Sequence, residues 1–155
     1  MKLSKLHINA ILPSKKHLSD AGWDLYTPEK IELMPWEQKI IGIGWKIEGH
    51  HVSFNMPSLN ICYQVWPKSG LDAKYGLHTG SGIIDSGYRG EILVLLKNMS
   101  DNPIIISAGS PIAQLIPVLI DPSYMEEVSD ISEVSDRGES GGILTAYNKE
   151  RKNNE

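Results

Sequence analysis

Residues 80–90 read Gly80-Ser81-Gly82-Ile83-Ile84-Asp85-Ser86-Gly87-Tyr88-Arg89-Gly90. Glycines supply the backbone freedom that tight turns need, and an Asp followed by Ser-Gly is a common turn composition. The opening Gly-x-Gly resembles a dinucleotide-binding fingerprint, but the third glycine and the following helix are missing. The stretch therefore predicts a tight β-hairpin, which would hold the Asp85 carboxylate rigidly.

Short apolar runs bounded by turn residues continue from this stretch toward both ends of the chain. They cover Leu3–Leu12, Lys39–Ile47, Val52–Asn55, Ile61–Trp66, Glu91–Leu96, Pro103–Ile106 and Ala113–Ile120. Turn residues separate them, as in Ser100-Asp101-Asn102-Pro103. Many short strands joined by turns predict an all-β domain, built as a sandwich or a barrel.

Composition limits the classes of protein to which the chain can belong. Its 155 residues are 41% hydrophobic and 22% charged, which fits one globular domain. The net charge of -4 disfavours a nucleic-acid partner, because such partners need many Lys and Arg contacts. Cys62 is the only cysteine, so neither an intrachain disulfide nor a Cys-x-x-Cys zinc site is expected. No apolar run approaches the roughly 20 residues that span a bilayer, and we expect a soluble protein without a signal peptide or a membrane partner.

One helix and one arm complete the predicted organisation. The segment Ser69–Tyr75 is expected to form a short helix with Ser69 near the N-cap, where free backbone N–H groups suit an anion. From residue 135 onward the chain is rich in Ser, Gly and charged residues and poor in core-forming ones. We therefore expect a β domain over residues 1–134 and a flexible C-terminal arm over residues 135–155.

Five unusual segments follow one another along the chain. They are Ala21-Gly22-Trp23-Asp24-Leu25, Pro67-Lys68-Ser69-Gly70-Leu71, Gly82-Ile83-Ile84-Asp85-Ser86-Gly87-Tyr88-Arg89-Gly90, Gly109-Ser110-Pro111-Ile112-Ala113-Gln114-Leu115-Ile116 and Arg137-Gly138. In this order they resemble the motifs of the dUTPase family: Ala-Gly-Tyr-Asp-Leu, Pro-Arg-Ser-Gly-Leu, Gly-Val-Ile-Asp-x-x-Tyr-x-Gly, Gly-Asp-Arg-Ile-Ala-Gln-Leu-Ile and a C-terminal Arg-Gly-x-Gly-Gly-Phe-Gly-Ser-Thr-Gly. The resemblance covers the chain from Ala21 to about Thr145.

The resemblance implies a fold, an assembly and a reaction. The fold would be a dUTPase-like β-barrel or jelly-roll domain that assembles as a homotrimer with active sites shared between subunits. The reaction would be magnesium-dependent (Mg²⁺) hydrolysis of dUTP to dUMP and pyrophosphate. Such a protein would work in the cytoplasm, or in the host-cell cytoplasm if the chain is viral.

The resemblance also assigns roles to individual residues. Asp85 would orient and deprotonate the water that attacks the α-phosphorus, although alone it reads as a turn aspartate. Tyr88 would lie against the deoxyribose and exclude a 2′-hydroxyl. The residues implied to line the uracil pocket, where main-chain groups read the base edge, are Thr79, Gly80, Gly82 and Ile84.

The phosphates and the metal engage a second group of residues. Ser69 and Gly70 would supply a hydroxyl and N–H groups to the phosphates, and Gln114 would contact them as well. Asp24 would hold the hydration shell of magnesium, since this ion retains its waters and needs no protein cage. Arg137 and Gly138 would bring the arm onto the γ-phosphate.

Two departures from the family pattern lead us to expect weaker binding of the substrate. Lys68 stands where the family usually has Arg, which keeps the positive charge but loses the planar, bidentate fork. In the arm, the aromatic residue that stacks on uracil is replaced by Gly142 or Ile143, depending on how Ser140 is aligned. We expect weaker closure of the arm over the base.

Two other readings remain open. A dUTPase-fold protein that sequesters or senses a nucleotide without rapid turnover would explain the altered arm, whereas the retained Asp85 favours hydrolysis. The dCTP deaminases share the fold and have a His-x-Thr-Ala stretch that Leu77-His78-Thr79-Gly80 partly matches. The glutamate that deamination needs is replaced by Leu95, which makes this reading the weaker one.

Overall fold

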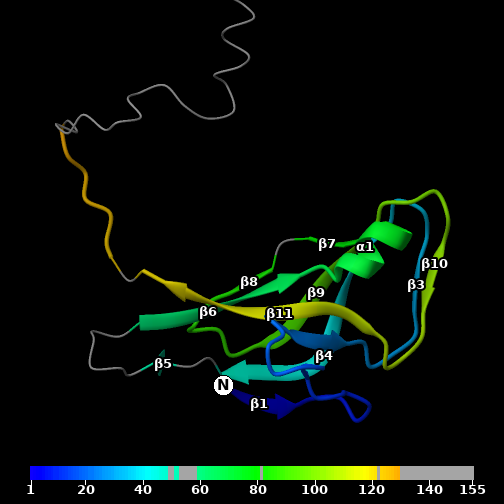
Figure 1. The fold of residues 1–155 in the computed structure, drawn as a ribbon, viewed down its shortest axis with the longest axis horizontal. Coiled ribbons are helices and arrows are strands. Elements are labelled where there is room, and N and C mark those ends of the chain that lie inside the picture. The colour runs from blue at the N-terminus through cyan, green and yellow to red at the C-terminus, as the bar shows by residue number, and fades with distance from the viewer. Residues whose placement is uncertain (49–50, 53–58, 81, 122, 130–155) are drawn as a thin grey trace, which may run out of the picture. The chain divides into compact units, whose positions relative to one another are not determined.

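A computed structural model describes residues 1–48, 51–52, 59–80, 82–121 and 123–129. Its elements in chain order are β1 (Lys2–Lys5), β2 (Trp23–Tyr26), β3 (Ile31–Leu33), β4 (Gln38–Glu48), β5 (His51–Val52), β6 (Leu59–Trp66), α1 (Ser69–Tyr75), β7 (Leu77–Thr79), β8 (Ile83–Ile84), β9 (Glu91–Asn98), β10 (Ile104–Ile106) and β11 (Pro111–Ile120). Strands thus dominate the described residues, which confirms the all-β class (Figure 1).

The strands form three antiparallel sheets. One sheet has the order β1-β4-β9-β7, a second has the order β2-β11-β6-β5 with β8 also on β6, and β10 pairs with β3. Within the described strands no sheet closes on itself, so the fold is jelly-roll-like, and the barrel form left open by the sequence is not the one adopted. Figure 1 shows β11 crossing the molecule beside β6, with α1 near β7.

The core lies between the inner faces of these sheets. In β9 the alternate residues Ile92, Val94 and Leu96 are fully buried, as the period-2 pattern of a half-buried strand requires. Leu25 of β2 and Leu115 of β11 are buried against the same core. Successive side chains of a strand point to opposite faces of its sheet, so Asp24 beside Leu25 and Gln114 beside Leu115 lie on the face turned away from the core.

The first predicted strand is shorter than the sequence suggested. It ends at Lys5, because the backbone N–H groups of Leu6 and His7 both turn toward the carbonyl of Gly44, at 2.8 and 3.4 Å. Ile8 beyond them is 84% exposed, so the apolar run Leu3–Leu12 does not mark a continuous strand.

The predicted hairpin over residues 80–90 is wrong. β7 pairs with β9, whereas β8 pairs with β6 in the other sheet, so the segment passes from one sheet to the other and back. Two hydrogen bonds fix the crossing: Gly80 N–H donates to the Leu95 carbonyl at 2.8 Å, and Val65 N–H donates to the Gly82 carbonyl at 2.7 Å. Asp85 therefore lies in a turn between sheets, not at the tip of a two-stranded hairpin.

The helix α1 occupies the predicted residues, but its N-cap is Lys68 instead of Ser69. Lys68 makes no side-chain capping bond, and its carbonyl accepts from the N–H groups of Leu71 and Asp72 at 2.9 and 3.0 Å. The helix stops at Gly76, which takes the left-handed conformation with φ of 66°. No residue of α1 is fully buried, so the helix rests on the domain surface.

The chain divides into two compact units, Met1–Pro122 and Ser123–Glu155. In the second unit the described residues 123–129 are all exposed and contain neither helix nor strand. The predicted boundary after residue 134 and the arm, with Arg137 and Gly138, lie outside the described residues. Within the described residues, no helix has the length and apolar character needed to cross a membrane.

Candidate active site

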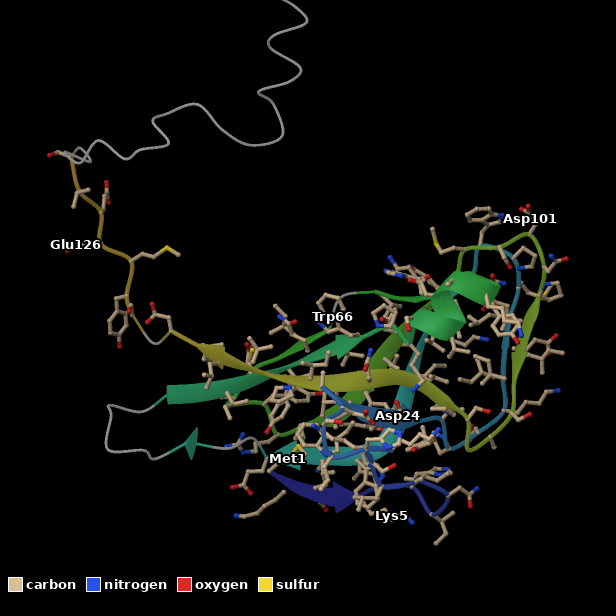
Figure 2. All side chains as sticks on the ribbon, in the orientation of Figure 1. Met1, Lys5, Asp24, Trp66, Asp101 and Glu126 are labelled. Carbon is tan, nitrogen blue, oxygen red and sulfur yellow. The ribbon has the colours of Figure 1, made fainter. Side chains whose placement is uncertain are left out.

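Three neighbouring strands bring motif residues into one row. Asp24 of β2 is the cross-strand partner of Gln114 on β11, and Gln114 is in turn the partner of Trp66 on β6. Figure 2 labels Asp24 and Trp66, which belong to the two strands that flank β11. The row joins segments that are more than 40 residues apart in the sequence, and it places the start of Pro67-Lys68-Ser69 beside Gln114.

Lys68 turns back across this row. Its ammonium group forms an ion pair with Asp24 Oδ1, and the two side chains are only 28% and 26% exposed. The predicted phosphate-binding lysine and the predicted metal-binding aspartate are thus in direct contact with each other. Sequence reasoning had placed both residues in the site but had not paired them.

Gln114 holds the loop that precedes the helix. Its amide Nε2 donates to the carbonyl of Pro67 at 3.0 Å, so the amide is engaged by the protein. Ser69 and Gly70 follow at the exposed start of α1. A Cβ added at Gly70 would meet no atom within 4 Å, so packing does not require this glycine, and space remains open beside it.

Asp85 and Tyr88 occupy the turn between β8 and β9. The turn is closed by the Tyr88 N–H, which donates to the Asp85 carbonyl at 3.0 Å. Within the described part of the chain the exposed Asp85 carboxylate makes no hydrogen bond, which differs from a turn aspartate that caps its own backbone. Tyr88 donates its hydroxyl to the Glu91 carbonyl at 2.8 Å. Its ring folds over Gly90, where an added Cβ would lie 2.3 Å from the hydroxyl oxygen.

The segment predicted to read the base packs closely on β6. A Cβ at Gly82 would lie 2.6 Å from Val65 Cβ, so the backbone approaches β6 as only glycine permits. Ile84 is 8% exposed and belongs to the core. Thr79 is 5% exposed, and its Oγ1 is the one buried side-chain N or O atom of the described residues that lacks a hydrogen-bond partner.

Within one chain the two groups of predicted residues stay apart. Ile84 of β8 is the cross-strand partner of Tyr63 on β6, so the next residue, Asp85, lies opposite Cys62. The Asp24 row meets β6 at Trp66, four residues further along the strand. That offset corresponds to roughly 13 Å along the strand. The structure therefore gathers Asp24, Lys68 and Gln114 with Ser69 following, and keeps Asp85 and Tyr88 in a separate cluster.

Sequence reasoning missed the segment before the first motif. The Asp24 N–H donates to the Ser14 carbonyl at 2.7 Å, and Ser14 Oγ lies 2.8 Å from the Tyr26 hydroxyl. The ammonium of Lys15 lies 4.5 Å from the centre of the Trp23 ring. The run Lys15-Lys16-His17, three residues ahead of the motif that begins at Ala21, was the signal that could have marked it.

Asp20 forms a hydrogen bond within this segment. Its carboxylate accepts from the His17 N–H at 2.8 Å, and this bond, followed by the nearby positive charges, holds the pKa of Asp20 below its usual value. The carboxylate therefore stays ionised, and it anchors the loop that leads into the Asp24 strand.

The metal expected from the sequence has few candidate protein ligands. Among the described residues, no three His, Cys, Asp or Glu side chains gather as a metal-binding group. Asp24 offers a partly exposed carboxylate within the cluster that was predicted to hold phosphates. This donor set fits a hydrated magnesium ion that is bound mainly by a triphosphate, because magnesium keeps several waters and takes one or two carboxylates.

Comparison with known proteins gives concordant results. The family profile of dUTPase matches residues 8–143. The deoxyuridine 5′-triphosphate nucleotidohydrolase of Clostridioides difficile is 37% identical over 149 residues, which cover 95% of this chain and 98% of that protein. Similar solved structures are the dUTPase of Staphylococcus bacteriophage 80alpha with dUpNHpp and a point mutant of the dUTPase from phage phi11 of S. aureus.

The two structures cover most of the chain. The first has a TM-score of 0.80 at 26% identity and covers 93% of this chain and 96% of that chain. The second, described with a structural Mg(II) ion, has a TM-score of 0.74 at 22% identity, covers 85% of this chain and 98% of that chain, and supports the fold alone. Since the family profile spans most of the sequence and the bacterial relative aligns over nearly its whole length, the chain belongs to the dUTPase family.

Proposed function

We propose that this protein hydrolyses dUTP to dUMP and pyrophosphate. The observation that carries the proposal is the cluster of Asp24, Lys68 and Gln114, in which three motifs of the dUTPase family meet: Asp24 and Gln114 lie on the paired strands β2 and β11, and Lys68 lies in the loop between β6 and α1. The cluster combines a carboxylate, an ammonium and an amide beside the exposed Ser69-Gly70 backbone, and these groups suit a triphosphate. The name of the bacterial relative agrees with this substrate.

In the proposed reaction, Asp85 accepts the proton of a water molecule that attacks the α-phosphorus in line with the leaving pyrophosphate. Its exposed carboxylate, which makes no hydrogen bond within the described residues, supports this role. Lys68 and Ser69 bind phosphate oxygens, and Gln114 sets the position of the loop that carries them. Tyr88 excludes a ribose 2′-hydroxyl, and the backbone from Thr79 to Ile84 reads uracil.

Asp24 would hold magnesium through its water shell. When bound, the ion neutralises the triphosphate and stabilises the charge of the leaving pyrophosphate. Asp24 is suited to this because its backbone is fixed between Ser14 and Gln114 while its side chain remains partly exposed.

The active site would be completed by neighbouring subunits of a homotrimer. The roughly 13 Å that separates Asp85 from the Asp24 row along β6 supports this arrangement, because one triphosphate has to meet both clusters. Arg137 and Gly138 of the arm would then close the site over the γ-phosphate. Buried, unpaired Cys62 suits the reducing cytoplasm, where we place the protein.

The test is pyrophosphate release by the purified protein with magnesium, measured in parallel on dUTP, dCTP, dTTP and UTP. Rapid release from dUTP alone supports the proposal and shows that the altered arm suffices for closure. Tight binding of dUTP without release would instead identify a sequestering protein. Selective release from another nucleotide would keep the chemistry and overturn the base assignment.

A further inference from the structure

The hydroxyl of Tyr88 is bound by the main chain at the end of its own turn. It donates to the carbonyl of Glu91 at 2.8 Å, and an added Cβ at Gly90 would lie 2.3 Å from the hydroxyl oxygen. Tyr88 remains 39% exposed, so part of its side chain can still contact a ligand. The direction of the Tyr88 ring therefore depends on where the backbone of residue 91 lies.

The side chain of Glu91 fastens that backbone to the neighbouring strand. Its Oε1 accepts a hydrogen bond from the Gly44 N–H on β4 at 2.8 Å. The carboxylate also lies against Gly42, where an added Cβ would come within 2.5 Å of Oε1. Glu91 is the first residue of β9, so it is the point at which the turn that carries Tyr88 joins the sheet.

A bulge in β4 makes this contact possible. Gly42 of β4 pairs with Leu93 of β9, and the next pair of the ladder is Lys46 with Glu91. The ladder thus advances four residues along β4 but only two along β9, and Gly44 in the extra stretch takes a φ of 77°. Bulges are frequent beside active sites, where they redirect a side chain or end a strand pairing. Here the bulge presents a backbone N–H to a carboxylate on the adjacent strand.

We propose that Glu91 is a positioning residue for Tyr88 and thereby contributes to the rejection of ribonucleotides. The inference rests on the proposed function, in which Tyr88 excludes a 2′-hydroxyl. To admit that hydroxyl the Tyr88 ring has to move, and this movement breaks its bond to the Glu91 carbonyl or pulls Glu91 away from the bulge. The carboxylate of Glu91 resists the displacement through Tyr88, without contacting the nucleotide itself.

The size of the effect follows from the bonds concerned. Loss of one hydrogen bond typically changes an equilibrium about fivefold, so removing the anchor should lower the dUTP-to-UTP ratio of kcat/KM by about that factor. The change should come mainly from a lower KM for UTP, because the deoxyribose of dUTP fits beside the ring in either position. A general loss of stability would affect both nucleotides alike and leave the ratio unchanged.

The experiment measures kcat and KM for dUTP and UTP in the wild type and three variants. Glu91→Ala removes the anchor and should lower the ratio. Glu91→Gln keeps an Oε1 acceptor for the Gly44 N–H and should retain the wild-type ratio. Glu48→Ala is the matched control, because Glu48 also lies on β4 but pairs with Lys2 at 3.4 Å, and it should not alter the ratio.

Tyr88→Phe tests the connection while Glu91 stays intact. It should lower the ratio by itself, and Glu91→Ala should lower it no further in that background, because both changes remove the same restraint. An unchanged ratio in Tyr88→Phe would overturn the proposal, and this result needs no folded Glu91 variant. An unchanged ratio in folded Glu91→Ala, or additive losses in the double variant, would overturn it as well.

Failure of the proposed function has a different signature, which is the absence of pyrophosphate release from dUTP by the wild type. The ratio is then measured from the affinities for dUpNHpp and its ribose counterpart, UpNHpp. The same variants should shift that binding ratio in the same direction.

Discussion

The side-chain amide of Gln114 donates a hydrogen bond to the backbone carbonyl of Pro67, 3.0 Å away. Gln114 is also the cross-strand partner of Asp24. One glutamine therefore connects the strand that carries the aspartate with the loop that carries Lys68. The family role of this glutamine as a phosphate contact leaves out its second role, which is to position the residue before the lysine.

Replacing Gln114 tests this positioning role. Gln114→Leu leaves the Pro67 carbonyl without its donor and should lower the free energy of unfolding by about 1 kcal/mol. It should also raise KM for dUTP, because Lys68 and Ser69 lose their support. The matched control is Gln64→Leu, since Gln64 accepts from Trp66 Nε1 at 2.7 Å in the same sheet. Equal KM values in the two variants would show that Gln114 does not position the loop.

Replacing Asp85 tests the proposed base. Asp85→Asn keeps the size of the side chain and should bind dUpNHpp as tightly as the wild type. Its kcat should fall by about 10²–10⁴-fold, the contribution typical of a positioned general base. Asp101→Asn, which changes an aspartate in a different turn, should keep full activity. Unchanged pyrophosphate release by Asp85→Asn would remove Asp85 from the mechanism.

The sequence predicted the long strands better than the short ones. Glu91–Leu96 was expected from its alternation, and β9 shows it because every second side chain enters the core. The strands β2, β3, β7 and β8 were missed, since a period of two cannot be recognised in two to four residues. The strands β2, β7 and β8 each pair with a longer strand, and β3 pairs with the short β10, so their formation depends on the tertiary structure.

The candidate site, too, was predicted only in part from the sequence. Asp24, Lys68 and Gln114 were named from their motifs, but their mutual contacts depend on how β2, β11 and β6 pair. The hairpin prediction failed for this reason. Gly80 and Gly82 were read as parts of one local turn, whereas β7 pairs with β9 and β8 pairs with β6, in different sheets.

Gly82 offers a test of this arrangement. A Cβ at this position would lie 2.6 Å from Val65 Cβ, and the backbone would have to move away from β6. Gly82→Ala should cost about 1–3 kcal/mol of stability, in the range of overpacked cores, and should weaken the preference for dUTP over dCTP. Gly87→Ala is the control, because a Cβ there meets no atom within 4 Å. Equal stability of the two variants would contradict the close approach.

Thr79 allows side-chain and main-chain roles to be separated. Its hydroxyl is buried without a partner among the described residues, so Thr79→Val should raise the free energy of unfolding by about 1 kcal/mol. If the base is read by main-chain groups, the dUTP-to-dCTP ratio of kcat/KM stays the same. Thr27→Val should instead destabilise, since the Thr27 hydroxyl donates to the Glu29 carbonyl at 2.7 Å. Loss of dUTP selectivity in Thr79→Val would show that the hydroxyl contacts the base.

Glu37 should make stability depend on pH. Its carboxylate accepts from the Met34 N–H at 2.7 Å, and this bond, with Lys39 nearby, holds the pKa of Glu37 below the usual 4.5. Because the folded-state pKa is the lower one, the ionised carboxylate stabilises the fold above pH 4.5, and this contribution is lost as the pH falls through the folded-state value.

Thermal unfolding midpoints of the wild type and Glu37→Gln, measured from neutral pH down to about pH 3, test this contribution. The glutamine variant cannot titrate at this position, so its midpoint should fall less steeply in acid than that of the wild type. Glu32→Gln, which removes a carboxylate from β3, gives the effect of removing charge alone. Parallel curves for the wild type and Glu37→Gln would mean that the Met34 bond forms equally well with a protonated side chain.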